Sequence, residues 1–64
     1  MILNELIEKL NRKVIEECLR EDGFIKEWMS SQLIDYEIEY FIEGLLEDIE
    51  NGLYTYEEVL EIYG

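Results

Sequence analysis

Hydrophobic positions recur at helical spacing along most of this chain, and residues 32–50 show that spacing most clearly. At about 100° per residue, the apolar side chains of this segment fall on one arc of a helix. They are Ile34, Ile38, Phe41, Ile42, Leu45 and Ile49, with Leu46 at the edge of the arc. A serine before the segment supplies an N-cap, and Asn51-Gly52 supplies a C-terminal stop. The pattern predicts an amphipathic helix over 32–50.

A second helix is predicted over residues 4–21, with Asn4 as its N-cap and Gly23 as its stop. Its apolar face comprises Leu3, Leu6, Ile7, Leu10, Val14 and Cys18, while Ile15 and Leu19 form a second short strip. Opposite charges four residues apart support its polar face: Glu5–Lys9, Glu8–Arg12 and Glu16–Arg20.

The remaining segments are shorter. Residues 24–31 predict a short helix or turn, because their apolar positions do not continue the register of 32–50; one continuous helix over 24–51 is the alternative. Residues 55–63 predict a last helix, in which Thr55 and Glu58 form a capping box. That helix would pack through Tyr56, Val59, Leu60 and Tyr63.

These elements predict an all-α fold: a single domain over 1–64, built as a bundle of three or four short helices with one strongly acidic face. The helices over 4–21 and 32–50 would pack antiparallel. A domain of 64 residues is marginally stable alone, so a homodimer or a partner complex is a way to stabilise it. Trp28 and Cys18 are assigned to the core.

The net charge of −12 changes the picture, because it is unevenly distributed. Residues 1–26 hold 5 basic and 6 acidic side chains, whereas residues 27–64 hold 11 acidic ones and no Lys or Arg. Such a balance excludes direct binding to nucleic acid or to an anionic membrane and favours a basic partner. The lone Cys18 cannot form an internal disulfide, and no apolar stretch is long enough for a membrane span; we therefore expect a cytoplasmic protein.

The polar arc of 32–50 carries carboxylates at four-residue spacing: Asp35, Glu39, Glu43 and Glu47. Neighbours lie roughly 6 Å apart along the axis, and each like-charge pair costs about 0.2–0.5 kcal/mol. One interpretation is an ordinary solvated face, partly neutralised by a stripe of Lys9, Lys13 and Arg20. The other is that the carboxylates imitate the phosphates of a nucleic acid.

Two tyrosines, Tyr36 and Tyr40, lie within the same acidic arc beside Leu33 and Gly44. They are either core residues, covered by 24–29 or by the last helix, or exposed anchors of an interface. We favour the core interpretation.

The sequence contains no arrangement that identifies a reaction. Without His and with one Cys, the chain has no zinc, di-iron or nucleophile–base pattern, and it has no phosphate-binding glycine loop. A calcium loop aligned on Gly52 fails, because Ile49 would occupy a position that must supply oxygen. No enzyme activity, cofactor or metal is predicted.

We therefore predict a small acidic inhibitor that binds a basic nucleic-acid-binding protein, of the nuclease or CRISPR-effector type, by DNA or RNA mimicry. Its general character is similar to that of compact acidic anti-restriction and anti-CRISPR proteins of phages and mobile elements; the similarity is compositional, and no motif matches a named family. The alternative is a helical adaptor or homodimeric module whose acidity serves solubility. The predicted partner-binding residues are Asp35, Tyr36, Glu39, Tyr40, Glu43, Glu47, Glu50, Glu57, Glu58 and Glu61.

Overall fold

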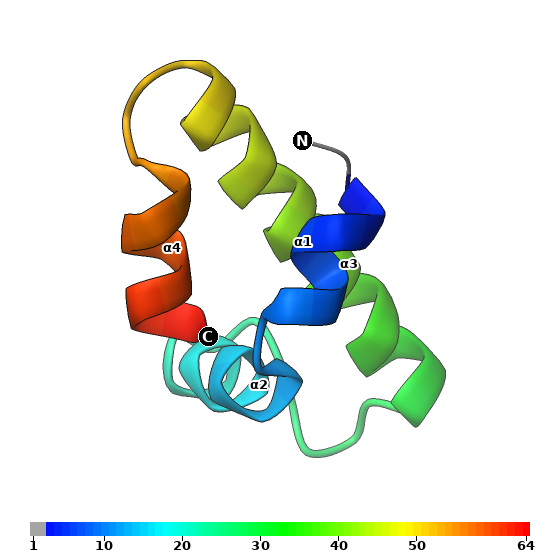
Figure 1. Ribbon diagram of the computed structural model, residues 1–64. Helices are drawn as coiled ribbons and strands as arrows, with labels where there is room; N and C mark the ends of the chain where they lie inside the picture. The colour runs from blue at the N-terminus through cyan, green and yellow to red at the C-terminus, as the bar shows by residue number, and fades with distance from the viewer. Residues whose placement is uncertain (1–2) are drawn as a thin grey trace.

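The computed structural model describes residues 3–64, with side chains from Glu5 onward, as four α-helices and no strand. They are α1 (Leu3–Lys9), α2 (Arg12–Glu21), α3 (Ser31–Glu50) and α4 (Tyr56–Tyr63). The prediction of an all-α compact fold is confirmed for these residues. In Figure 1, α3 runs the length of the molecule, α1 and α2 pack against α3, and α4 packs against α2.

The long helix predicted over 4–21 is wrong, because the chain breaks between α1 and α2. Asn11 has an extended backbone and its side chain accepts a hydrogen bond from the N–H of Lys13, so it caps α2. The Asn11 N–H donates to the carbonyl oxygen of Tyr63 at 2.7 Å, which fastens the break to the end of α4. The predicted antiparallel pair of long helices is therefore absent: Figure 1 shows α2 nearly end-on where α1 and α3 lie across the view. Asn4 lies within α1, and its predicted capping side chain is outside the described part.

The break also changes which residues form the core. In one continuous helix, Ile15 would point about 140° away from Leu10. With the chain broken, both side chains are buried, together with Leu6 and Leu19. Val14, which the continuous register assigned to the core, is exposed, and Cys18 is half-buried.

The predictions for the two later helices are confirmed. The side chain of Ser30 caps α3, and α3 ends with Gly52 in the left-handed conformation at φ +79°. The N–H of Leu53 donates to the carbonyl of Asp48, the six-to-one bond of a Schellman motif. The capping box of Thr55 and Glu58 starts α4 with both hydrogen bonds formed, at 3.0 and 3.1 Å.

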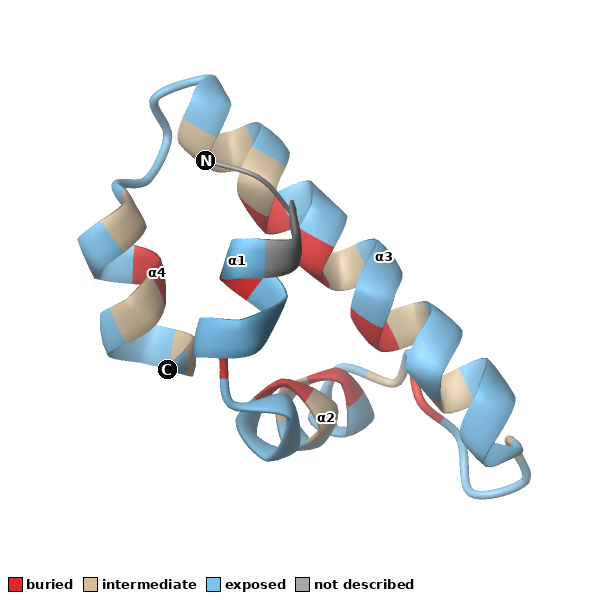
Figure 2. Cartoon of the chain, turned by 45° about the vertical axis from the view of Figure 1, so that its right-hand side comes forward, coloured by how far each residue is buried: buried red, intermediate tan, exposed pale blue. Residues whose placement is uncertain are grey.

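The core is a single cluster to which every helix contributes. Its buried members are Leu6, Leu10, Ile15, Leu19, Ile25, Ile38, Ile42, Leu45 and Val59. The apolar arc predicted for α3 and the packing face predicted for α4 are confirmed, since their other members are half-buried against this cluster. Figure 2 shows the buried positions of α3 on the side that faces α1 and α2, and exposed positions on its far side.

Residues 24–30 form a loop with a turn rather than a helix, so the break before α3 is real and a continuous 24–51 helix is excluded. Ile25 is the anchor of this loop, at 2% exposed. The prediction that Trp28 belongs to the core is wrong: its side chain is 78% exposed at the tip of the turn. None of the described helices combines the length and apolarity needed to cross a membrane.

Candidate binding surface

The outward face of α3 carries two unpartnered tyrosines. Tyr36 and Tyr40 are each 70% exposed, so the preferred prediction that they are core residues is wrong. The cover that we expected does not form, because the 24–30 loop inserts only Ile25 into the core and α4 packs elsewhere. Phe41 and Tyr63 meet edge to face with their ring centroids 5.4 Å apart, which places α4 against the Phe41 edge of α3. The two tyrosines are left facing solvent.

Four of the predicted site residues lie together around these rings. Tyr36, Glu39, Tyr40 and Glu43 line one shallow depression of about 170 Å³ on the surface of α3. Helical spacing explains the grouping, since positions three and four apart are neighbours on one face. Glu47 and Glu50 continue the exposed surface toward the end of the helix.

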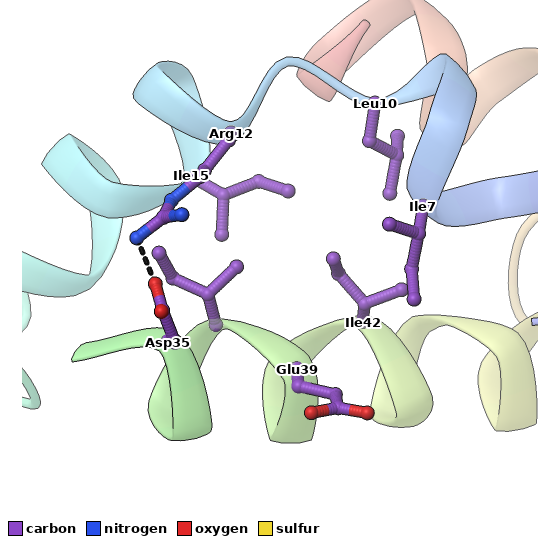
Figure 3. Close-up of a pocket in the computed structure, with 8 residues that line it drawn as sticks. Ile7, Leu10, Arg12, Ile15, Asp35, Glu39 and Ile42 are labelled. Atoms are coloured by element: carbon purple, nitrogen blue, oxygen red, sulfur yellow. Dashed lines mark hydrogen bonds and ion pairs between the residues drawn. The ribbon is translucent and has the colours of Figure 1, made fainter. Parts of the chain in front are cut away.

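Among the described side chains, Asp35 is the only predicted site residue that an ion pair neutralises. Its carboxylate forms an ion pair with the guanidinium of Arg12, which reaches across from α2 (Figure 3). Figure 3 also shows Glu39 pointing away from α2. The ion pair is more than half exposed on both sides, so we expect it to contribute at most about 1 kcal/mol. The pairing removes Asp35 from the set of carboxylates that are free to bind a partner.

Among the described side chains, no other Lys or Arg forms an ion pair with α3. Arg20 pairs with Glu16 within α2 at 3.5 Å, and the Lys9 amine lies 5.8 Å from the ring centroid of Tyr56. Within residues 5–64, no ion pair joins α3 to Lys9, Lys13 or Arg20, so the neutralising stripe predicted from these three residues is not formed. Glu39, Glu43, Glu47 and Glu50 stay exposed and have no ion partner among the described side chains.

The predicted site residues of α4 do not join this surface. Glu57, Glu58 and Glu61 are exposed, but α4 packs on the Phe41 edge of α3, apart from the depression around Tyr36 and Tyr40. The carboxylate of Glu58 is also engaged locally, as the acceptor in the capping box. The exposed carboxylates of α4 therefore lie apart from those that surround Tyr36 and Tyr40 on α3.

A neighbouring apolar groove was missed by the sequence reasoning. It lies on the flank of α3 that faces the end of α2 and has a volume of about 280 Å³. Its lining consists of Leu19, Phe24, Glu37, Tyr40, Phe41, Gly44, Leu45 and Asp48. Phe24 is 60% exposed, and a Cβ built on Gly44 would meet no atom within 4 Å. The signal in the sequence was Gly44, a residue without a side chain beside aromatic neighbours.

Burial raises the pKa of the Tyr63 phenol above 10.0, and the charges of Cys18, Tyr54 and Asp22 add to this effect. Tyr63 lies on α4, away from the acidic depression. Among the described residues, no group of three His, Cys, Asp or Glu side chains could hold a metal ion.

Comparisons with known proteins leave the chain without an assigned family: no protein-family model, curated protein or solved structure matches it.

Proposed function

We propose that this chain is a small non-enzymatic inhibitor that binds a basic nucleic-acid-binding protein through the outer face of α3 and so excludes the nucleic acid. The observation that carries the proposal is the row of exposed, unpaired carboxylates with two exposed tyrosines between them. The chain has five Lys and Arg side chains, and none of them forms an ion pair with these carboxylates. A cationic surface on another protein would neutralise them.

The length and charge of the face match a short stretch of one nucleic-acid strand. From Glu39 to Glu50 the helix rises about 16 Å and presents four free carboxylates. A DNA strand rises about 3.4 Å per phosphate, so the face spans about five nucleotides. The face would then imitate one strand. Its charge density is lower than that of the strand, and direct contacts from Tyr36 and Tyr40 would offset this difference, because tyrosine often anchors interfaces. Complementary charge would accelerate the encounter, and the buried contacts would set the lifetime of the complex.

The proposed partner is a protein whose groove is lined by Lys and Arg for nucleic acid, such as a nuclease or a CRISPR effector. The inhibition would involve no chemical step. The binding would weaken steeply as salt rises, because exposed charges supply the attraction.

Charge reversal on α3 tests the proposal against a matched control. Glu39→Lys with Glu43→Lys reverses the centre of the face, whereas Glu5→Lys with Glu8→Lys changes the net charge equally on exposed positions of α1. The tagged proteins would be used to capture partners from the host lysate at low and high salt, followed by competition with duplex and single-stranded oligonucleotides. We expect the α3 variant to lose the partner, the α1 variant to retain it and nucleic acid to displace the wild-type chain. Equal binding by both variants, at unchanged helical content, would refute mimicry by α3.

The second candidate is a helical adaptor, and the exposed apolar groove beside Phe24 and Gly44 favours it. An adaptor bound through that groove would tolerate salt, since apolar contacts are not screened, and nucleic acid would not displace it. The same capture experiment therefore separates the two functions.

A further inference from the structure

The groove between the end of α2 and the flank of α3 is an unfilled apolar surface with an acidic rim. Leu19, Phe41 and Leu45 form its inner lining, while Phe24 stands exposed at the edge. Its volume of about 280 Å³ lies below the range of about 300–1,000 Å³ typical of small-molecule pockets. Side chains of another protein suit a shallow hollow of this size better than a free ligand does.

We infer that this groove binds a basic amphipathic helix of the partner, which inserts apolar side chains over Gly44 and places Lys or Arg beside Glu37 and Asp48. The inference deepens the proposed function and rests on it for the cationic character of the partner. It adds a second contact region and states the shape of the segment that the partner presents there.

Charge selects this occupant. Glu37 and Asp48 are half-buried carboxylates on the groove, and no Lys or Arg lines it. A second copy of the chain would bring another net charge of −12 to the same place, so self-association through the groove is opposed by repulsion. A helix with Lys or Arg flanking its apolar stripe satisfies both the apolar lining and the acidic rim.

Geometry supports a helix as the occupant. Glu37 and Asp48 are separated by about 16 Å along α3, the length of about three helical turns. Gly44 lies between them, and the space above it is open, so a partner backbone can approach α3 closely there. The exposed ring of Phe24 would pack against one side of such a helix.

Two synthetic peptides probe the groove without knowledge of the natural partner. One is a Leu/Lys peptide of about 14 residues, with Leu at helical spacing, and the other has the same composition with the Leu residues scattered. Each would be titrated into the ¹⁵N-labelled full chain in moderate salt, with affinities measured by calorimetry and the affected residues identified from amide shifts. We expect tighter binding of the amphipathic peptide, with shifts centred on Gly44 and Asp48.

Substitution at Gly44 supplies the matched variants. Gly44→Met would fill the groove, whereas Gly44→Ala adds one methyl group and serves as the backbone control; both are good helix formers. We expect Gly44→Met to lower the affinity for the amphipathic peptide about tenfold or more and Gly44→Ala to lower it much less. The reason is that only the Met side chain fills the space that an apolar side chain of the peptide would occupy. The inference is overturned if both peptides bind alike, if the shifts centre on Tyr36 and Glu39, which line the acidic depression and not the groove, or if Gly44→Met binds the peptide as the wild-type chain does.

The two proposals fail separately. Loss of capture on reversing Glu39 and Glu43, together with unchanged peptide binding by Gly44→Met, would support the acidic face and reject the groove. Retained capture by the charge-reversed variant, with loss of peptide binding on Gly44→Met, would reject mimicry and support the groove.

Discussion

The substitution of Gly44 by Ala makes a sharp test of the described surface of α3. Gly44 lies in the interior of this helix with an ordinary helical backbone, since the only described residues at positive φ are Gly23 and Gly52. A Cβ at position 44 would meet no atom within 4 Å. Alanine therefore introduces no clash and removes the conformational freedom that glycine has in the unfolded chain.

The expected magnitude follows from helix propensity. Alanine is about 0.8–1.0 kcal/mol more favourable than glycine in a helix interior, so Gly44→Ala should increase the free energy of unfolding by that amount. In a domain of this size, 1 kcal/mol raises the melting temperature by about 4–8 °C. Urea unfolding followed by circular dichroism, at fixed pH and salt, gives the first quantity, and a thermal scan gives the second.

Gly52 supplies a control with the opposite sign. Its Cβ would also meet nothing within 4 Å, but its φ of +79° belongs to the left-handed region. Gly52→Ala should lower the free energy of unfolding by about 1–2 kcal/mol, because an L side chain is strained there. The same substitution thus has opposite effects at two open positions. If Gly44→Ala destabilised the protein, the space above Gly44 would have to be occupied, and the exposed surface of α3 would be refuted.

Three further predictions concern the fold. Asn11→Ala should lower the free energy of unfolding by about 0.5–2 kcal/mol, because it removes the cap of α2. Asn11→Asp should keep most of that stability, since Asp is also a good N-cap, and urea unfolding compares the two variants. Ile15→Ala should lower the free energy of unfolding by about 2–5 kcal/mol and Val14→Ala by under about 1 kcal/mol, since only Ile15 of the two is fully buried. Comparable losses for the two variants would show that Val14 is a core residue and would contradict the break between α1 and α2. The raised pKa of Tyr63 means that the folded state holds its phenol proton when the unfolded state, titrating near 10.0, has lost it. Stability should therefore decline as pH rises through 10 toward the folded pKa, and Tyr63→Phe should lessen that decline in urea unfolding between pH 9 and 11.

The sequence alone determined those features that depend on a few adjacent residues. Ser30 and Thr55 cap the helices that follow them, and Gly52 ends α3, because each forms its hydrogen bonds or special backbone angle within one turn. The apolar arc of α3 was equally predictable, since twenty residues at helical spacing leave one side for the core. The dense charge of residues 27–64 is likewise a property of the sequence.

Tertiary contacts decided where the first helix breaks and what covers α3. The sequence of 4–21 has a helical pattern throughout. The side chain of Asn11 can cap a helix that begins at Arg12, and the burial of both Leu10 and Ile15, with the bond from the Asn11 N–H to the Tyr63 carbonyl, selects the break there. The exposure of Tyr36 and Tyr40 and the open groove at Gly44 depend on where the 24–30 loop and α4 pack. Those positions follow from contacts between segments distant in the sequence. Local periodicity cannot encode them, because it specifies which side of a helix is apolar but not which neighbour covers it.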